Sequence, residues 1–328
     1  MKKPIIGITM GDPSGIGPEL ILKVLAKEEP YRYCHPFVIG DPEVMGEASK
    51  IVGGNLEIKA IQEISEARFL FSSVEVLCPK GVDIREIGWG RLDPAKGKAA
   101  ALCLEKAFRM ALEKKIDGVV SAPLNKEAFH RAGYPYIDEL EFFAEITNSP
   151  DPFVIGVMDA LWTVTVTFHI PFKDIVPMIK KDRILRFIHL MDQILKKIGI
   201  ADPKIAVAAL NVHAGEGGLI GREEIEEIRP AIEEAQRSRI KAQGPFPADT
   251  IFVVAMREGF DAVVGMYHDQ VNIARKLSPT RKGATLYMGL PVKCGTTAHG
   301  TAFDIAGKGI ADPGSLEEAL KYTAMLSS

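Results

Sequence analysis

The segment KIAVAALNVHAGEGG, Lys204 to Gly218, carries the pattern that decides the fold. After Lys204 the residues up to Leu210 are small or apolar and do not alternate with polar ones, which is typical of a strand covered by helices on both faces. A polar turn with glycines follows at once. Runs of the same kind stand at Ile5–Met10, Asp117–Ala122 and Asp261–Met266, and each ends in a glycine, proline or polar turn.

Helical patterns separate these apolar runs, and the alternation predicts an α/β fold with a largely parallel sheet. The predicted helices are Pro18–Lys27, Ala95–Lys114, Arg183–Ile198, Arg222–Arg237 and Ser315–Met325. The segment Pro152–His169 differs, because its β-branched residues alternate around Asp159-Ala160. That pattern predicts a hairpin and therefore a mixed sheet in the middle of the chain.

Length and composition limit the possible functions. The chain has 328 residues, 47% of them hydrophobic, a length that usually means two domains. Its formal net charge of −3 gives no electrostatic case for binding nucleic acid or an anionic membrane. The N-terminal apolar run stops at Gly11-Asp12-Pro13, too early for a signal peptide or membrane span, so we expect a cytoplasmic protein.

Three histidines follow three of the predicted strands. His169 ends TVTVTFH, His213 comes shortly after KIAVAAL, and His268 follows DAVVGM. The carboxyl ends of parallel strands meet at one edge of a sheet, where ligands bind, so these imidazoles can converge on one point. Three neutral imidazoles suit a divalent transition metal and leave coordination positions open, although a single strand-end histidine is usually structural.

Three further motifs allow more than one interpretation. GDPSGIGPEL, Gly11–Leu20, lies between a predicted strand and helix and is either a tight turn or a loop that closely approaches a ligand. Asp249 in PADT either caps a helix or faces the metal. Lys276 is either a solvated lysine or a base with a lowered pKa near a metal-bound alcohol.

Six stretches together resemble the 4-hydroxythreonine-4-phosphate dehydrogenase (PdxA-type) family. They are ITMGDPSGIGPE from Ile8, SAPLNKEAFHRAG from Ser121, NVHAGEGGLIG from Asn211, GPFPADTIF from Gly244, MYHDQ from Met266 and HGTAFDIAG from His299. This family resembles isocitrate and isopropylmalate dehydrogenases, which implies two α/β domains with a cleft between them. We place one domain, with the cofactor segment, at residues 1–125 plus 265–328. The other, with the dimer interface and the metal ligands, is placed at residues 126–264.

The resemblance also implies a mechanism and partners. It implies a homodimer whose active sites are each completed by the partner subunit. A divalent metal (Zn, Mg, Mn or Co) would be held by His169, His213 and His268, one of them from the other chain. NAD would be the hydride acceptor. The implied reaction is oxidation of a secondary alcohol β to a carboxylate, with the metal as Lewis acid, followed by decarboxylation, in pyridoxine biosynthesis.

The cofactor and substrate residues are assigned by the same resemblance. The adenosine of NAD would lie near His299, Gly300, Thr301, Ala302 and Asp304, with Gly15 and Gly17 in the loop after the first strand. Because the segment offers Asp304 and no paired arginines, NAD is expected rather than NADP. Lys276 matches the family's substrate-binding lysine.

The predicted substrate pocket departs from the family pattern at Glu139, Leu140, Thr285 and Cys294. Where the family has GHTE this chain has IDELE, Asn-Ile-Thr becomes Thr285-Leu286-Tyr287, and the phosphate-binding arginine becomes Cys294. Three phosphate contacts, each worth roughly 1.5–3 kcal/mol, are lost and a carboxylate is gained. Lys293 or Arg281 could compensate in part.

Several functions therefore stay open. The first is an NAD- and metal-dependent dehydrogenase like the 4-hydroxythreonine-4-phosphate enzymes. Alternatives within the family act on a 4-phosphothreonate- or erythronate-type sugar acid, or on an unphosphorylated cis-dihydrodiol carboxylate. A non-catalytic metal-binding protein of the same fold is the last alternative, and the complete histidine trio with Lys276 and Asp304 speaks against it.

Overall fold

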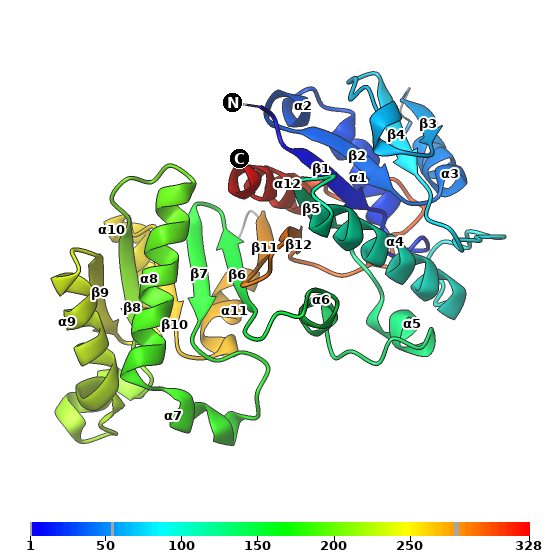
Figure 1. The fold of residues 1–328 in the computed structure, drawn as a ribbon. Helices are drawn as coiled ribbons and strands as arrows, with labels where there is room; N and C mark the ends of the chain where they lie inside the picture. Colours follow the sequence, from blue (N-terminus) through cyan, green and yellow to red (C-terminus); the bar gives the residue numbers. More distant parts are fainter. Residues whose placement is uncertain (1, 54–55, 279–281) are drawn as a thin grey trace. The chain divides into compact units, whose positions relative to one another are not determined.

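The computed structural model describes residues 2–53, 56–278 and 282–328. The chain forms two compact units, Met1–Phe153 with Gly283–Ser328, and Val154–Lys282 (Figure 1). We call them unit 1 and unit 2. The domain boundaries that the sequence predicts, at 125/126 and 264/265, stay a prediction.

Unit 1 contains strands in the order β3-β4-β2-β1-β5-β12-β11. Neighbours pair in parallel except β11 and β12, which are antiparallel. The strands are β1 (Ile5–Thr9), β2 (His35–Ile39), β3 (Glu57–Ile61), β4 (Ser73–Leu77), β5 (Gly118–Ser121), β11 (Gly283–Met288) and β12 (Lys293–Thr297). The carboxyl ends of β1, β5 and β12 therefore share one edge of the sheet.

Helices cover this sheet. They are α1 (Gly17–Leu25), α2 (Glu29–Tyr33), α3 (Pro42–Val52), α4 (Pro94–Leu112), α5 (Lys126–Arg131), α6 (Glu139–Thr147) and α12 (Gly314–Ser327), with a 3₁₀ turn η1 (Ile64–Glu66). Helix α4 packs on β1 and β5, and α12 packs on β5, β11 and β12. Asp93 caps α4 by accepting from the Ala95 N–H, and Pro94 occupies the first helical turn, where its missing N–H costs nothing.

Unit 2 contains a second α/β layer, with strand order β6-β7-β10-β8-β9. Its strands are β6 (Phe153–Met158), β7 (Leu161–Thr165), β8 (Lys204–Ala208), β9 (Lys241–Phe246) and β10 (Ala262–Gly265). Its helical segments are η2 (Phe172–Asp174), α7 (Ile175–Met178), α8 (Lys181–Lys197), η3 (Val212–Gly218), η4 (Glu224–Ile228), α9 (Arg229–Arg237), α10 (Ile251–Glu258) and α11 (His268–Lys276). Strands β7, β10, β8 and β9 run parallel, and β6 pairs antiparallel with β7.

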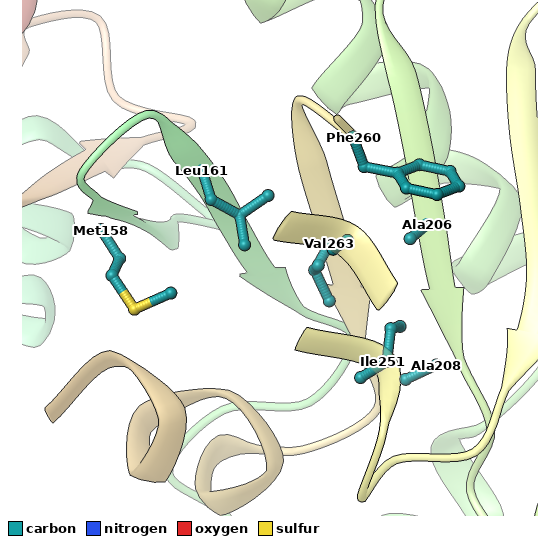
Figure 2. Close-up of a cluster of buried hydrophobic side chains, with 8 residues drawn as sticks. Met158, Leu161, Ala206, Ala208, Ile251, Phe260 and Val263 are labelled. Carbon is teal, nitrogen blue, oxygen red and sulfur yellow. The ribbon is translucent and has the colours of Figure 1, made fainter. Parts of the chain in front are cut away.

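A cluster of buried apolar side chains fixes strands β7, β8 and β10 beneath α10 (Figure 2). Ala206 and Ala208 of β8 are at most 1% exposed, and Ile251 of α10 lies beside Ala208. Burying such side chains stabilises the folded state by roughly 25 cal/mol per Å² of apolar surface. The strand that leads to His213 is therefore held firmly up to its last residue.

The predicted α/β fold, the four apolar strands and the hairpin at Asp159-Ala160 are confirmed. One predicted helix differs. Residues 222–237 form a π-helical turn, η4, and then α9. Pro230 has no N–H with which to continue a regular α-helical ladder across this junction. The sequence-based prediction missed strands β2–β4, β9, β11 and β12, because polar residues, glycine or proline interrupt their apolar pattern.

Candidate functional site

The three predicted metal ligands follow three neighbouring parallel strands of unit 2. His169 comes four residues after β7, His268 three residues after β10 and His213 five residues after β8. Since β10 pairs with both β7 and β8, His268 follows the central strand and the other two follow its neighbours. All three thus emerge at the same edge of the sheet.

His169 and His268 lie close together, with ring centres 5.5 Å apart. Two imidazoles that bind one ion at about 2.1 Å have ring centres roughly 5–5.5 Å apart, so this pair fits a shared metal. The Nδ1 atom of His268 lies 2.9 Å from Oδ1 of Asp269. A carboxylate on one ring nitrogen is the usual support of a metal-binding histidine and leaves Nε2 to ligate.

His213 has the same kind of support but is not part of that pair. Its Nδ1 atom lies 2.9 Å from Oε1 of Glu216. Within residues 2–53, 56–278 and 282–328, no three His, Cys, Asp or Glu side chains come close enough to hold a metal. The structure therefore brings His169 and His268 together, whereas His213 of the same chain stands apart with its Nε2 available.

The turn that carries His213 is left-handed. His213, Ala214, Gly215, Glu216 and Gly217 have φ angles of 49°, 55°, 77°, 45° and 66°, each with positive ψ. A left-handed conformation costs about 1–2 kcal/mol for each residue with a side chain, so the three non-glycine residues store about 3–6 kcal/mol. Strain of this kind persists only where the surroundings enforce it, and it concentrates at functional sites.

The buried carboxylate of Glu224 holds the base of this turn. Its Oε1 accepts hydrogen bonds from the backbone N–H groups of Leu210 at 2.9 Å and Asn211 at 2.7 Å. Its Oε2 accepts from Nδ2 of Asn211 at 2.9 Å. Glu224 is 1% exposed and was not among the predicted site residues. A pair of glutamates directly after a glycine-rich turn was the available signal.

Gln270 connects the strand ends that lead to His213 and His268. Its Nε2 donates to the Ala209 carbonyl at 2.9 Å, and its Oε1 accepts from the Met266 N–H at 2.8 Å. On the other side, Oγ1 of Thr167 donates to the Met266 carbonyl at 2.8 Å. These side chains fix the spacing of the three strand ends from which the histidines emerge.

The two predicted catalytic residues also lie in unit 2. Lys276 is the exposed last residue of α11, the helix that His268 begins, so about 12 Å of helix axis separates their α-carbons. Asp249 is exposed in the loop before α10. The helix-cap interpretation of Asp249 is wrong, because Thr250 occupies the cap position and α10 has no side-chain cap.

The predicted cofactor segment lies against the glycine loop within unit 1. The Ile16 N–H donates to the Thr301 carbonyl at 3.1 Å, and a Cβ at Gly15 would lie 2.9 Å from Cβ of Thr301. Glu19 accepts from the Gly307 N–H at 2.6 Å. Of the predicted cofactor residues, Thr301 is buried, whereas His299, Gly300 and Asp304 are exposed. Ala302 follows Thr301 in the same segment, and Gly17 follows the glycine loop as the first residue of α1. Glycine at 15 is therefore required by the close approach of residue 301.

A third segment, residues 87–96, joins these two and was not identified from the sequence. The Gly90 N–H donates to the Ser14 carbonyl at 2.8 Å, and Oγ of Ser14 donates to the Ile87 carbonyl. Lys96 is 5% exposed and donates to the Ile87 carbonyl. Trp89 lies directly over Gly307. The tryptophan and glycines in IGWGRL were the available signal.

Asp12 is a buried acid within this assembly. Its Oδ1 accepts from the Ser14 N–H at 2.8 Å, while Oδ2 is buried with no hydrogen-bond partner among the described residues. Burial raises the pKa of the Asp12 carboxyl from 3.8 to about 6, against the opposing effects of the Ser14 N–H and the Lys96 charge. An unpartnered buried acceptor beside a glycine loop fits a loop that binds a ligand.

Asp12→Asn is expected to gain stability relative to the parent as the pH rises from 5 to 8. The carboxyl ionises near pH 3.8 in the unfolded chain but near pH 6 when folded, so the parent's unfolding free energy falls through this window. The difference should grow by about 1 kcal/mol between pH 5 and pH 8. Urea unfolding at both pH values measures it, with the exposed Asp83→Asn as control. Equal pH dependence in all three proteins would contradict the prediction.

Two of the departures in the predicted substrate pocket, Glu139 and Cys294, lie together in a partly buried cluster of unit 1. Glu139 at the start of α6 accepts from Oγ of Ser121 and from Oη of Tyr287, both at 2.9 Å. Burial raises the pKa of the Glu139 carboxyl, and burial together with Glu139 raises the pKa of the Cys294 thiol. Glu139 is thus satisfied by two hydroxyl donors beside a neutral thiol.

The other predicted pocket residues are Leu140 and Thr285, with Lys293 and Arg281 as the predicted compensating cations. Leu140 is 8% exposed, and Thr285 lies in β11. Asp138 caps α6 by accepting from the Glu141 N–H, so the acidic residue at 138 in IDELE has a structural role. Lys293 begins β12, whereas Arg281 lies outside the described residues.

Comparison with known proteins gives the family. The family described as "Pyridoxal phosphate biosynthetic protein PdxA" matches residues 32–323. The chain belongs to the PdxA family. This PdxA-family chain is similar to a Halalkalibacterium halodurans protein provisionally named D-threonate 4-phosphate dehydrogenase, with 38% identity over 98% of this chain and 97% of that protein.

Solved structures of similar chains support the same family assignment. A 4-hydroxythreonine-4-phosphate dehydrogenase from Burkholderia phymatum has 40% identity and a TM-score of 0.81, covering 99% of both chains. One from Klebsiella pneumoniae has 33% identity and a TM-score of 0.84, covering 99% of this chain and 98% of that one. The resemblance, the α/β fold class and the assignment as an oxidoreductase acting on CH–OH are confirmed.

Across the part of the chain that the structure describes, no helix has the length and hydropathy needed to cross a membrane.

Proposed function

We propose that this PdxA-family dehydrogenase oxidises the secondary alcohol of a small hydroxy acid that carries a 4-phosphate, with NAD and a divalent metal. The observation that carries the proposal is the pair His169 and His268 at one edge of the sheet, with Asp269 on Nδ1 of His268. The names of the relatives supply the substrate class, D-threonate 4-phosphate or 4-hydroxythreonine-4-phosphate. Loss of carbon dioxide from the β-keto acid product is part of the proposal.

The metal would be held by three histidines, His169 and His268 of one chain and His213 of the other. Bound there, Zn, Mg, Mn or Co would supply a Lewis acid for the alcohol oxygen. Asp269 and Glu216 hold Nδ1 of two of these imidazoles, which leaves Nε2 of each to face the ion.

We further propose that the site is completed in a homodimer. His213 stands apart from the other two histidines of its own chain, and Lys276 lies about 12 Å along α11 from His268. A second subunit would supply what one chain does not bring together. Val212, Leu219 and Ile220 around the His213 turn are 62%, 89% and 44% exposed, which suits burial against another copy. Lys276 or Asp249 would then act as the base.

NAD would bind at the glycine loop and the segment after β12. These two segments contact each other at Gly15 and Thr301, and Gly17 begins α1. His299, Gly300, Ala302 and Asp304 would lie along the adenosine. The exposed carboxylate of Asp304 suits a ribose hydroxyl and would repel a 2′-phosphate, which favours NAD over NADP.

One observation favours a second candidate, an unphosphorylated hydroxy acid. The positions Glu139, Leu140, Thr285 and Cys294 would contact the distal end of the substrate. Glu139 is a partly buried acid held by Ser121 and Tyr287, and Cys294 is buried and neutral. A phosphate dianion next to this carboxyl would need cations that these positions do not provide.

The two candidates differ in the expected kinetics with D-threonate 4-phosphate and D-threonate. For the proposed function we expect kcat/KM to be at least about 100-fold higher for the phosphorylated acid, because each charge-assisted hydrogen bond to phosphate is worth roughly 1.5–3 kcal/mol. The measurement is NADH absorbance with metal-loaded protein, and Glu139→Gln serves as a companion variant. Higher activity on the unphosphorylated acid would support the second candidate, and no turnover of any hydroxy acid would contradict both.

A further inference from the structure

The left-handed turn His213–Gly217 determines which side chains meet His213. In a tight helical turn, residues three apart lie over one another. The turn therefore brings the carboxylate of Glu216 back to the imidazole, where Oε1 lies 2.9 Å from Nδ1. The contact depends on the left-handed backbone of both residues.

The base of the turn is built so that this backbone cannot relax. Glu224 accepts from the N–H groups of Leu210 and Asn211, which fixes the chain where it leaves β8. A Cβ at Gly215 would lie 2.7 Å from Oε2 of Glu224, so only glycine fits there. Strand β8 itself is fixed by the apolar cluster under α10 (Figure 2).

His268 shows the same arrangement on a different backbone. It begins α11 and receives the carboxylate of the next residue, Asp269, at 2.9 Å from Nδ1. His213 receives that of Glu216 at the same distance from the same nitrogen. Two imidazoles at neighbouring strand ends therefore both leave Nε2 available, although their local structures have nothing in common.

We propose that Glu216 is a positioning residue of the metal site, presented to His213 by the left-handed turn that Glu224 holds in place. Glu216 keeps the hydrogen on Nδ1 and orients the ring so that Nε2 can ligate. This rests on the proposed function, because it takes His213 to be a metal ligand. The Glu216 side chain acts on the metal site through its contact with the histidine.

The test is a Co²⁺ titration of metal-free full-length protein, followed by calorimetry and by the visible absorption of the bound ion. Glu216→Ala is expected to weaken Co²⁺ binding 10- to 100-fold, as is usual when the support of a ligating histidine is removed. Glu216→Gln should stay within about 3-fold of the parent, because its amide oxygen still accepts from Nδ1–H. The matched control is Glu226→Ala, an exposed glutamate that pairs with Arg222 and should stay within about 2-fold.

Rescue by glutamine separates positioning from a general loss of folding, and near-ultraviolet circular dichroism checks the fold of each variant. If the parent binds Co²⁺, His213→Ala does not, and Glu216→Ala binds like the parent, the positioning role is overturned and the metal proposal stands. If the parent binds no Co²⁺, the metal proposal fails and the positioning role fails with it. Equal weakening by Glu216→Ala and Glu226→Ala would also overturn it.

Discussion

His213→Ala is expected to purify without bound divalent metal and to lose dehydrogenase activity while the protein stays folded. The imidazole is exposed at the end of a strand whose core packing it does not join, so its removal leaves the apolar cluster intact. A metal Lewis acid contributes several kcal/mol to the transition state, and each 1.36 kcal/mol is tenfold in rate. Turnover should therefore fall by a factor of about 1,000 or more.

Elemental analysis of the purified parent and variant measures the metal, and NADH absorbance measures turnover. His130→Ala is the matched control, because His130 is exposed at the end of α5 in unit 1. The control should keep both the metal and the activity. Equal metal in the parent and His213→Ala would show that His213 is not an essential ligand.

Glu224→Ala is expected to lower the unfolding free energy of unit 2 by about 3–5 kcal/mol. The carboxylate is buried and accepts three hydrogen bonds, two of them from backbone N–H groups of Leu210 and Asn211. Each buried donor left without an acceptor costs about 1–3 kcal/mol. The left-handed turn would also lose the contact that holds its base.

Urea unfolding followed by circular dichroism tests this prediction, with Glu233→Ala on the exposed face of α9 as control. The control should change the unfolding free energy by less than about 0.5 kcal/mol. Glu224→Gln should fall between the two, because it keeps the acceptor for the backbone groups and presents an NH₂ group to Asn211. A loss below about 1 kcal/mol for Glu224→Ala would mean that the turn holds its shape by other contacts.

The sequence predicts those buried strands whose residues form a continuous apolar run, because burial on both faces leaves such a run. This is why β1, β5, β8 and β10 could be located within a few residues of their observed ends. Strand β3, with sequence EIKAI, is only partly buried and carries charges, so it gives no comparable signal. The π-helical turn before α9 lies within a segment that reads as one continuous helix, and no periodicity in the sequence reports it.

The candidate site, like the fold, could be predicted from the sequence only in part. The placement of three histidines after three strands could be predicted, because strand ends and residue types are both visible in the sequence. The order β7-β10-β8, which makes His169 and His268 neighbours, depends on pairing between segments about 100 residues apart. Glu216 could not be predicted, because its contact with His213 follows from a run of left-handed residues that only the folded backbone reveals. The assignments of metal, cofactor and substrate residues stay predictions.

The placement of β12 beside β5 has a consequence for the synthesis of the chain on the ribosome. Ser121 ends β5, and its neighbour β12 begins at Lys293, 172 residues further along the chain. At about 5–20 residues per second, a ribosome needs roughly 10–30 s to make that stretch. All of unit 2 is made in this interval, while the nascent chain keeps one side of β5 without its partner strand. An unpaired apolar edge invites association with other chains, so we expect the newly made chain to be prone to association until β12 has been made.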